Sequence, residues 1–125
     1  PNVLVVPSAS YDEHENLKAT AKAAAPFFTS LIQDGDKIGV SWGYTLLEIA
    51  KNVPVSSLPN TSIVQIAGNL DNADSTNFAH EIVNQFGQRL GISSQITLPC
   101  PVIVENPIIV DLLSHDSKIS SVLSL

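Results

Sequence analysis

The stretch Lys37-Ile-Gly-Val-Ser-Trp-Gly-Tyr-Thr-Leu46 passes directly from a strand pattern to a helix pattern. Residues 37–41 predict a short buried strand, and the apolar positions of residues 44–52 predict a helix. Only Trp42 and Gly43 are left between the two. A strand that leads into a helix through so short a junction is typical of the repeating unit of α/β proteins.

The segments on both sides continue this alternation of strands and helices. The predicted elements, in order, are a strand at 3–6, a helix at about 13–32, the strand and helix described above, a strand at 62–66, a helix through 78–90, a strand at 96–98 and a helix from about 107. Pro26 is expected to kink or divide the first helix. The alternation predicts an α/β fold with a parallel sheet and right-handed crossovers.

The composition limits the classes of protein to which the chain can belong. Its 125 residues, 44% of them apolar, are enough for one hydrophobic core and too few for two, so residues 1–125 are expected to form a single domain. The single cysteine, Cys100, excludes an internal disulfide and favours a cytoplasmic location. No apolar run approaches the roughly 20 residues of a membrane span, so no membrane association is predicted.

The charge argues against nucleic-acid binding by this chain itself. Six Lys and Arg against twelve Asp and Glu give a formal charge of −6, and no candidate helix carries a basic stripe. Proteins that bind DNA draw much of their affinity from cations that displace the counterions of phosphates. Because the chain starts at Pro1 and lacks Met, it is expected to be a piece of a longer protein. Contact with DNA is therefore expected only from another segment of that protein.

The loop from Ser41 to Thr45 has the most chemical content of the predicted loops. Ligands of parallel sheets bind beyond the carboxyl ends of the strands, and the first turn of a helix favours an anion. Gly43 would let the backbone approach a phosphate, and the hydroxyls of Ser41 and Thr45 can donate hydrogen bonds. An equally good interpretation is structural: Gly43 makes the turn, Thr45 caps the helix and Trp42 fills the core.

Two further loops supply candidate ligand contacts. Asn69, which follows Gly68 after the strand at 62–66, could bond to a sugar hydroxyl or could simply be a turn residue. Asn77 is expected in the first turn of the next helix, near the same edge of the sheet, where it could equally be a helix-start residue. No histidine has a cysteine or carboxylate at metal-ligand spacing, and no nucleotide-binding glycine motif is present, so neither a metal nor a cofactor is predicted.

The segment 34–46, Asp-Gly-Asp-Lys-Ile-Gly-Val-Ser-Trp-Gly-Tyr-Thr-Leu, resembles the signature of the sugar-binding domains of SorC-family transcriptional regulators. Residues 3–8, 63–69 and 98–102 resemble that family's opening Val-Val-Pro, its Val-Gln-x-x-Gly strand end and its proline-flanked loop. The resemblance covers the whole chain in order. The family's domain continues past a point corresponding to Leu125, so the chain is expected to be the N-terminal half of such a domain.

The resemblance implies a Rossmann-like domain related to sugar-phosphate isomerases and aminosugar-phosphate deaminases. It also implies a homo-oligomer, an attached N-terminal helix-turn-helix and a phosphorylated sugar as effector, with the phosphate held by residues 41–45. After the third strand the family usually has a glycine-rich loop, whereas this chain has Ala67-Gly-Asn-Leu70, which affects the identity of the ligand. The predicted effector-binding residues are Ser41, Trp42, Gly43, Tyr44, Thr45, Gly68, Asn69 and Asn77.

These observations predict the ligand-sensing domain of a bacterial transcriptional regulator, in which a phosphorylated sugar modulates DNA binding by a separate domain. An isomerase-like or deaminase-like enzyme is the alternative on the same fold. Enzyme chemistry would require a placed acid and base, and the chain offers no carboxylate-histidine pair for that role, so no catalytic residue is predicted. A third possibility is that residues 99–107 and the last helix mediate subunit contacts.

Overall fold

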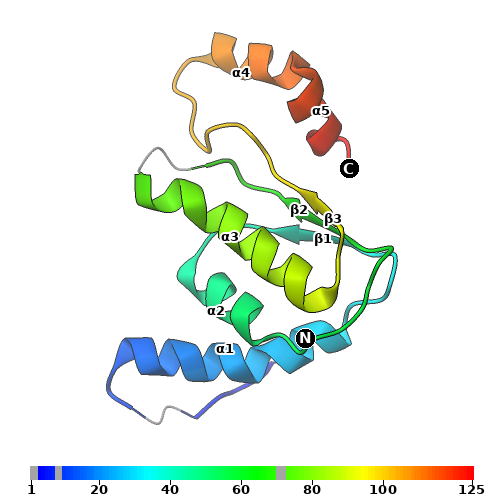
Figure 1. Ribbon diagram of the computed structural model, residues 1–125. Coiled ribbons are helices and arrows are strands. Elements are labelled where there is room, and N and C mark those ends of the chain that lie inside the picture. Colours follow the sequence, from blue (N-terminus) through cyan, green and yellow to red (C-terminus); the bar gives the residue numbers. More distant parts are fainter. Residues whose placement is uncertain (1–2, 8–9, 70–72) are drawn as a thin grey trace.

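The computed structural model describes residues 3–7, 10–69 and 73–125 (Figure 1). The elements are α1 (Glu13–Ser30), β1 (Lys37–Val40), α2 (Tyr44–Asn52), β2 (Ser62–Gln65), α3 (Ala73–Leu90), β3 (Ser94–Ile96), α4 (Pro107–His115) and α5 (Ser117–Leu123). Within these ranges no helix is both long and apolar enough to cross a membrane.

The three strands form one parallel sheet in the order β1-β2-β3. Val40 is in register with Gln65, and Val64 with Ile96. Helix α2 connects β1 to β2, and α3 connects β2 to β3. The predicted α/β class with a parallel sheet is therefore confirmed, as is the Rossmann-like arrangement of strands and flanking helices.

One face of the sheet and the inner faces of α1, α2 and α3 form the core. Along β1, Ile38 and Val40 are buried and alternate with exposed residues, as expected for a strand with one face against helices. Helix α3 buries Ile82, Phe86 and Leu90, which recur every four residues and so lie on one face. Each fully buried side chain of this size contributes about 1.5–3 kcal/mol. This layer fixes the strand ends from which the candidate site is built.

The predicted strand at 3–6 is wrong. This segment has no strand structure, and the exposed fractions of Val3 and Val5 are 79% and 82%. A β-branched run forms a strand only where a neighbouring strand supplies hydrogen bonds and a face to pack against, and the sheet of the described residues offers this segment neither. The residue types of this segment suit a strand, but no described strand lies beside it.

Several elements differ in their bounds from the sequence prediction. Strand β3 covers 94–96, because beyond Ile96 the amide of Leu98 bonds to the Gln65 side chain (3.4 Å) and no longer to a strand backbone. Helix α5 was not predicted; Asp116 starts it by accepting hydrogen bonds from the amides of Lys118 and Ile119. Helix α1 continues through Pro26, so the proline does not divide it.

The α4–α5 pair lies at the opposite end of the molecule from α1 (Figure 1). Helix α4 has no buried residue although most of its side chains are apolar, and the exposed fraction of Ile108 is 69%. Asp111, Ser114 and His115 lie on one side of α4, and its remaining side chains are apolar. An apolar helix face is usually buried against a neighbouring element. The predicted last helix thus exists, with an apolar surface that the described residues leave uncovered.

Candidate functional site

The junction between β1 and α2 is built around Gly43. Strand β1 ends at the buried Val40, and α2 begins at Tyr44 with Gly43 as its N-cap. Gly43 has φ of 147°, a conformation that other residues rarely adopt. A Cβ at this position would meet no atom within 4 Å, so the backbone conformation, and not crowding, calls for glycine. Open space therefore lies above the Gly43 backbone.

The N-terminus of α2 differs from those of α1, α4 and α5. In these three helices an Asp or Asn side chain accepts a hydrogen bond from a first-turn amide: from His14 in α1 (2.8 Å), from Ile108 in α4 (2.9 Å) and from Lys118 in α5 (2.9 Å). Gly43 has no side chain that could do so. Gly43 thus supplies no acidic or amide cap to the first turn of α2, where the helix carries a partial positive charge.

The structural interpretation of this loop does not hold for two of its three residues. Thr45 lies inside α2 and is exposed, so it does not cap the helix. Trp42 is 37% exposed and does not belong to the buried core cluster. Only the third part of that interpretation holds, because Gly43 makes the turn. Thr45 is exposed and Ser41 is half-buried; both stay predicted ligand residues at the N-terminal end of α2.

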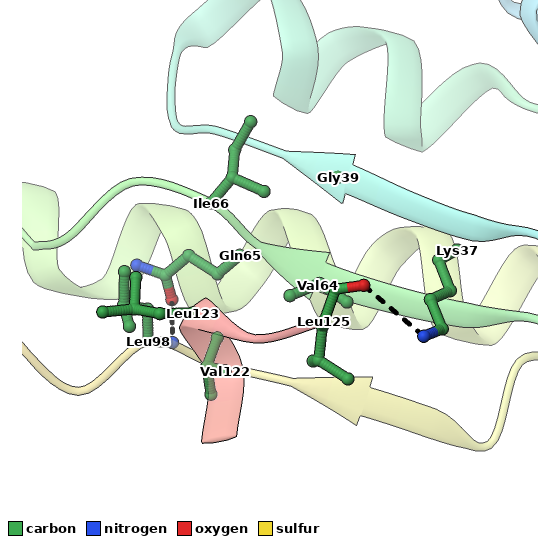
Figure 2. A pocket seen from close by; sticks show the side chains of 9 residues that line it. All are labelled: Lys37, Gly39, Val64, Gln65, Ile66, Leu98, Val122, Leu123 and Leu125. Carbon is green, nitrogen blue, oxygen red and sulfur yellow. Dashed lines mark hydrogen bonds between the residues drawn. The ribbon is translucent and has the colours of Figure 1, made fainter. Parts of the chain in front are cut away.

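The end of β2 is held by the side chain of Gln65, which is 2% exposed. Its Nε2 donates to the Ala67 carbonyl (2.7 Å) and to Asn69 Oδ1 (3.0 Å). Its Oε1 accepts from the amide of Leu98 at 3.4 Å, a bond drawn in Figure 2. One buried carboxamide thus joins the end of β2, the following loop and the segment after β3.

The loop at 67–69 is tied to the proline-flanked segment by backbone contacts. The Asn69 amide donates to the Cys100 carbonyl (2.8 Å), and the Val102 amide donates to the Asn69 carbonyl (2.9 Å). A Cβ on Gly68 would lie 2.6 Å from the carbonyl oxygens of Cys100 and Pro101. Glycine at 68 is therefore explained by the close approach of two backbone segments, whether or not it also contacts a ligand.

The two loops lie at the same edge of the sheet. Val40 and Gln65 are in register at the ends of neighbouring parallel strands, and the Ile66 amide still donates to the Val40 carbonyl (2.9 Å). Residues 41–45 and 67–69 both follow this point. Helix α3 begins at Ala73, so Asn77 lies just after its first turn, and the Asn77 side chain is outside the described residues.

A pocket of about 320 Å³ lies elsewhere, on the sheet face where the chain ends after α5 (Figure 2). Its lining includes Val64, Ile66 and Leu125, and the Lys37 ammonium donates to the Leu125 carbonyl at 3.4 Å. None of the predicted site residues lines it. The pocket shares Gln65 and Leu98 with the hydrogen-bonded end of β2, but it does not include the predicted ligand loops.

The family model described as "Putative sugar-binding domain" matches residues 1–125, the whole chain. The chain belongs to this sugar-binding domain family. The sequence resemblance to the sugar-binding domains of SorC-type regulators is thereby confirmed, and solved structures and curated relatives agree with it.

Two solved relatives illustrate the shared fold of this sugar-binding domain. The sorbitol operon regulator SorC from Klebsiella pneumoniae superposes with a TM-score of 0.86 at 23% identity, over 97% of this chain and 40% of that one. A DeoR family transcriptional regulator from Listeria monocytogenes gives 0.79 at 26% identity, over 97% of this chain and 46% of the other. The deoxyribonucleoside regulator of Bacillus subtilis is 24% identical over 84% of this chain. The chain spans 33% of that regulator's length.

Two of the described titratable groups have shifted pKa values, and a carboxylate-histidine pair not identified from the sequence, Asp111 and His115, lies on α4 with 3.8 Å between Oδ1 and Nδ1. Hydrogen bonds from Asn60 hold the pKa of Asp34 below its usual value, at the turn before β1 and so at the other edge of the sheet. Burial raises the pKa of the Cys100 thiol, which makes the reactive thiolate scarcer. In the part of the chain that the structure describes, no three His, Cys, Asp or Glu residues come together as metal ligands.

Sequence reasoning missed Gln65. The residue was placed in a strand and in the Val-Gln-x-x-Gly motif but was given no role, although a polar side chain in a buried strand must find partners. That signal was available in Ser62-Ile-Val-Gln-Ile66. What the sequence could not supply is the identity of those partners, Ala67, Asn69 and Leu98.

Proposed function

We propose that this chain is the effector-sensing part of a bacterial transcriptional regulator and that it binds a phosphorylated sugar at the carboxyl edge of β1 and β2. The observation that carries the proposal is the α2 N-terminus, which follows β1 directly and has Gly43 in place of a capping side chain. Helix N-termini stabilise anions through the direction of their backbone amides and a partial charge of about +0.5.

The sugar is expected to extend from this phosphate site toward the neighbouring loop. Ser41 and Thr45 offer hydroxyls beside the helix end, and Asn69 offers a side-chain amide on the next strand. The exposed rings of Trp42 and Tyr44 provide apolar surface for a sugar ring. The Klebsiella and Bacillus relatives are named for sorbitol and deoxyribonucleosides, which favours a small polyhydroxylated ligand without fixing its identity.

Regulation would follow from a difference in affinity. A ligand changes the equilibrium between two arrangements of a protein only to the extent that it binds one of them more tightly. In a regulator, those arrangements would differ in how a separate helix-turn-helix domain meets its operator. The acidic chain described above would not contact DNA itself.

The test uses the full-length protein and a panel of sugar phosphates, each paired with the unphosphorylated sugar. The melting temperature should rise with at least one phosphorylated member and stay unchanged with its unphosphorylated partner, because ligand binding to the native state stabilises it. A panel in which no phosphorylated sugar shifts the melting temperature would overturn the proposal.

The enzyme alternative draws no support from the relatives named above, each of which is called a regulator. An NMR time course of the intact protein with the same panel checks it directly. Conversion of any sugar phosphate into product would establish an isomerase-like or deaminase-like activity.

The exposed apolar residues of α4 favour an added role in subunit contact with a second copy of this protein. The net charge of −6 makes copies repel each other over most of their surface, whereas α4 carries one acid, Asp111, 3.8 Å from His115 Nδ1. Ile108→Asp in the full-length protein should lower the oligomeric state measured by light scattering. Lys118→Asp on α5 is the control; equal oligomeric states for wild type and Ile108→Asp would exclude this contact.

A further inference from the structure

The strongest unexplained arrangement is the contact between the buried Gln65 and Asn69. An amide side chain presents an acceptor on one side and donors on the other, and which side faces a neighbour decides what the group can bind. In Gln65 this choice is dictated by backbone groups, which cannot change their own roles. The inference below rests on the proposed function, because it concerns the same site.

Two backbone atoms fix the orientation of Gln65. The Leu98 amide can only donate, so the Gln65 atom that faces it must be the oxygen, Oε1 (3.4 Å). The Ala67 carbonyl can only accept, so the atom that faces it must be the nitrogen, Nε2 (2.7 Å). A reversed carboxamide would place donor against donor and acceptor against acceptor in a site that is nearly closed to water.

Gln65 in turn fixes Asn69. Nε2 has a second hydrogen, directed at the Asn69 side chain, so the facing atom must be an acceptor, Oδ1 (3.0 Å). The Asn69 backbone amide and carbonyl are already bonded to Cys100 and Val102. Nδ2, with its two donors, is the group of Asn69 that these contacts leave available.

Asn69 Nδ2 has no hydrogen-bond partner among the described residues. Asn69 is half-buried, and in the described part of the chain no buried side-chain nitrogen or oxygen lacks a hydrogen-bond partner. No contact of Asn69 Nδ2 is found in that part of the chain, and this is the donor group that the inference assigns to the ligand. It lies one strand away from the open N-terminus of α2.

We propose that Gln65 is a positioning residue that turns Asn69 into an obligate hydrogen-bond donor toward the bound effector. The ligand group at this place is therefore an acceptor oxygen, of a hydroxyl, carbonyl or phosphate. An ammonium group, as in an aminosugar, would meet donors and is disfavoured there. The loop after β2 thus contributes selectivity for oxygen substituents beside a phosphate held by α2.

The orientation is tested first without ligand, by hydrogen exchange of side-chain amides in the ¹⁵N-labelled full-length protein. The Gln65 amide should exchange slowly because both its donors are bonded, and the Asn69 amide should exchange quickly. In Gln65→Glu, an ionised carboxylate offers only acceptors, so Asn69 should rotate and its amide should become slow. A slow Asn69 amide in the wild type would overturn the inference.

The ligand contact is tested with the best sugar phosphate from the panel. Asn69→Ala should weaken binding about tenfold, the range for a hydrogen bond at a polar site. Asn69→Asp keeps the shape and the bond from Gln65 but replaces donors by an acceptor, and should weaken binding further. Asn52→Ala, whose amide bonds within α2 to the Glu48 carbonyl, is the matched control and should leave affinity unchanged.

The outcomes separate this inference from the proposed function. If sugar phosphates bind and Asn69→Asp binds as tightly as wild type, the donor role is wrong while the proposed function stands. If no sugar phosphate binds, the proposed function and the ligand role of Asn69 both fail, and only the amide orientation remains. Should Gln65→Glu not fold, Gln65→Met serves instead. Methionine cannot fix the orientation of the Asn69 amide, so this variant should bind the sugar phosphate more weakly.

Discussion

The loops that follow β1 and β2 lie at one edge of the sheet, yet they use their polar groups in opposite ways. After β1, the turn at Gly43 leaves a helix start without a capping side chain and keeps the hydroxyl of Thr45 exposed. After β2, Gln65 and Asn69 direct nearly every polar group toward protein partners. The first loop is suited to general attraction of an anion, and the second to a single oriented contact.

This difference predicts which mutations should change stability and which should change ligand binding. Groups that bond within the protein contribute to folding, and their loss leaves buried partners unsatisfied. Groups that remain open contribute little to folding and can serve a ligand. The loop after β2 should therefore report mainly on stability and the loop after β1 mainly on affinity.

The largest effect is expected from Gly68→Val. A Cβ there would lie 2.6 Å from the carbonyls of Cys100 and Pro101, which must move apart and weaken the bonds of Asn69. The free energy of unfolding should fall by about 3 kcal/mol, as for other overpacked sites. Urea denaturation measures it. Gly35→Val, where a Cβ meets no atom within 4 Å but φ is 103°, measures backbone strain without crowding; Gly68 has no positive φ, so an unchanged free energy of unfolding in Gly68→Val would contradict the crowding argument.

Thr45→Ala should weaken ligand binding and leave the stability nearly unchanged. The Thr45 side chain is exposed, so the free energy of unfolding should change by less than about 0.5 kcal/mol. Affinity for the sugar phosphate should fall about tenfold, because a hydrogen bond to a charged group is lost. Calorimetric titration gives the affinity. Thr20→Ala, an exposed threonine on α1 whose hydroxyl bonds to the Asn16 carbonyl, should bind as wild type does.

The smallest effect is expected from Asp34→Asn, at the other edge of the sheet. Hydrogen bonds from Asn60 lower the pKa of Asp34 in the folded protein, so the stabilisation is present above the unfolded pKa and is lost as pH falls through the folded one, below about pH 4. Asp34→Asn should reduce the acid dependence of the melting temperature in that window. Ligand affinity at pH 7 should not change; a loss there would mean that the two edges are coupled.

The fold was largely predictable because its signals are local. The spacing of Ile82, Phe86 and Leu90 predicted α3, and the short run before Ser41 predicted β1 and its direct passage into α2. The segment at 3–6 shows the limit of such signals. Its apolar β-branched residues satisfy the strand pattern, but a strand also needs a neighbour, and no local pattern states whether one is there.

The candidate site was predictable in part. A glycine between a strand and a helix indicated the turn at Gly43, and the resemblance drew attention to residues 41–45. Whether Thr45 or Trp42 had structural roles was open until their exposure was known. Gln65 appeared in the sequence only as part of the Val-Gln-x-x-Gly strand end; its bond to Leu98, 33 residues away, could not be predicted from a local pattern.

The sequence by itself determined the order of elements, the parallel sheet and the family to which the chain belongs, since periodicity and short motifs are written in neighbouring residues. Only the tertiary structure decided which groups remain open at the strand ends. Hydrogen bonds between distant segments settle that matter: Leu98 and Ala67 orient Gln65, and Gln65 orients Asn69. Gly68 has its role for the same reason, because the backbone that excludes a side chain there comes from Cys100 and Pro101.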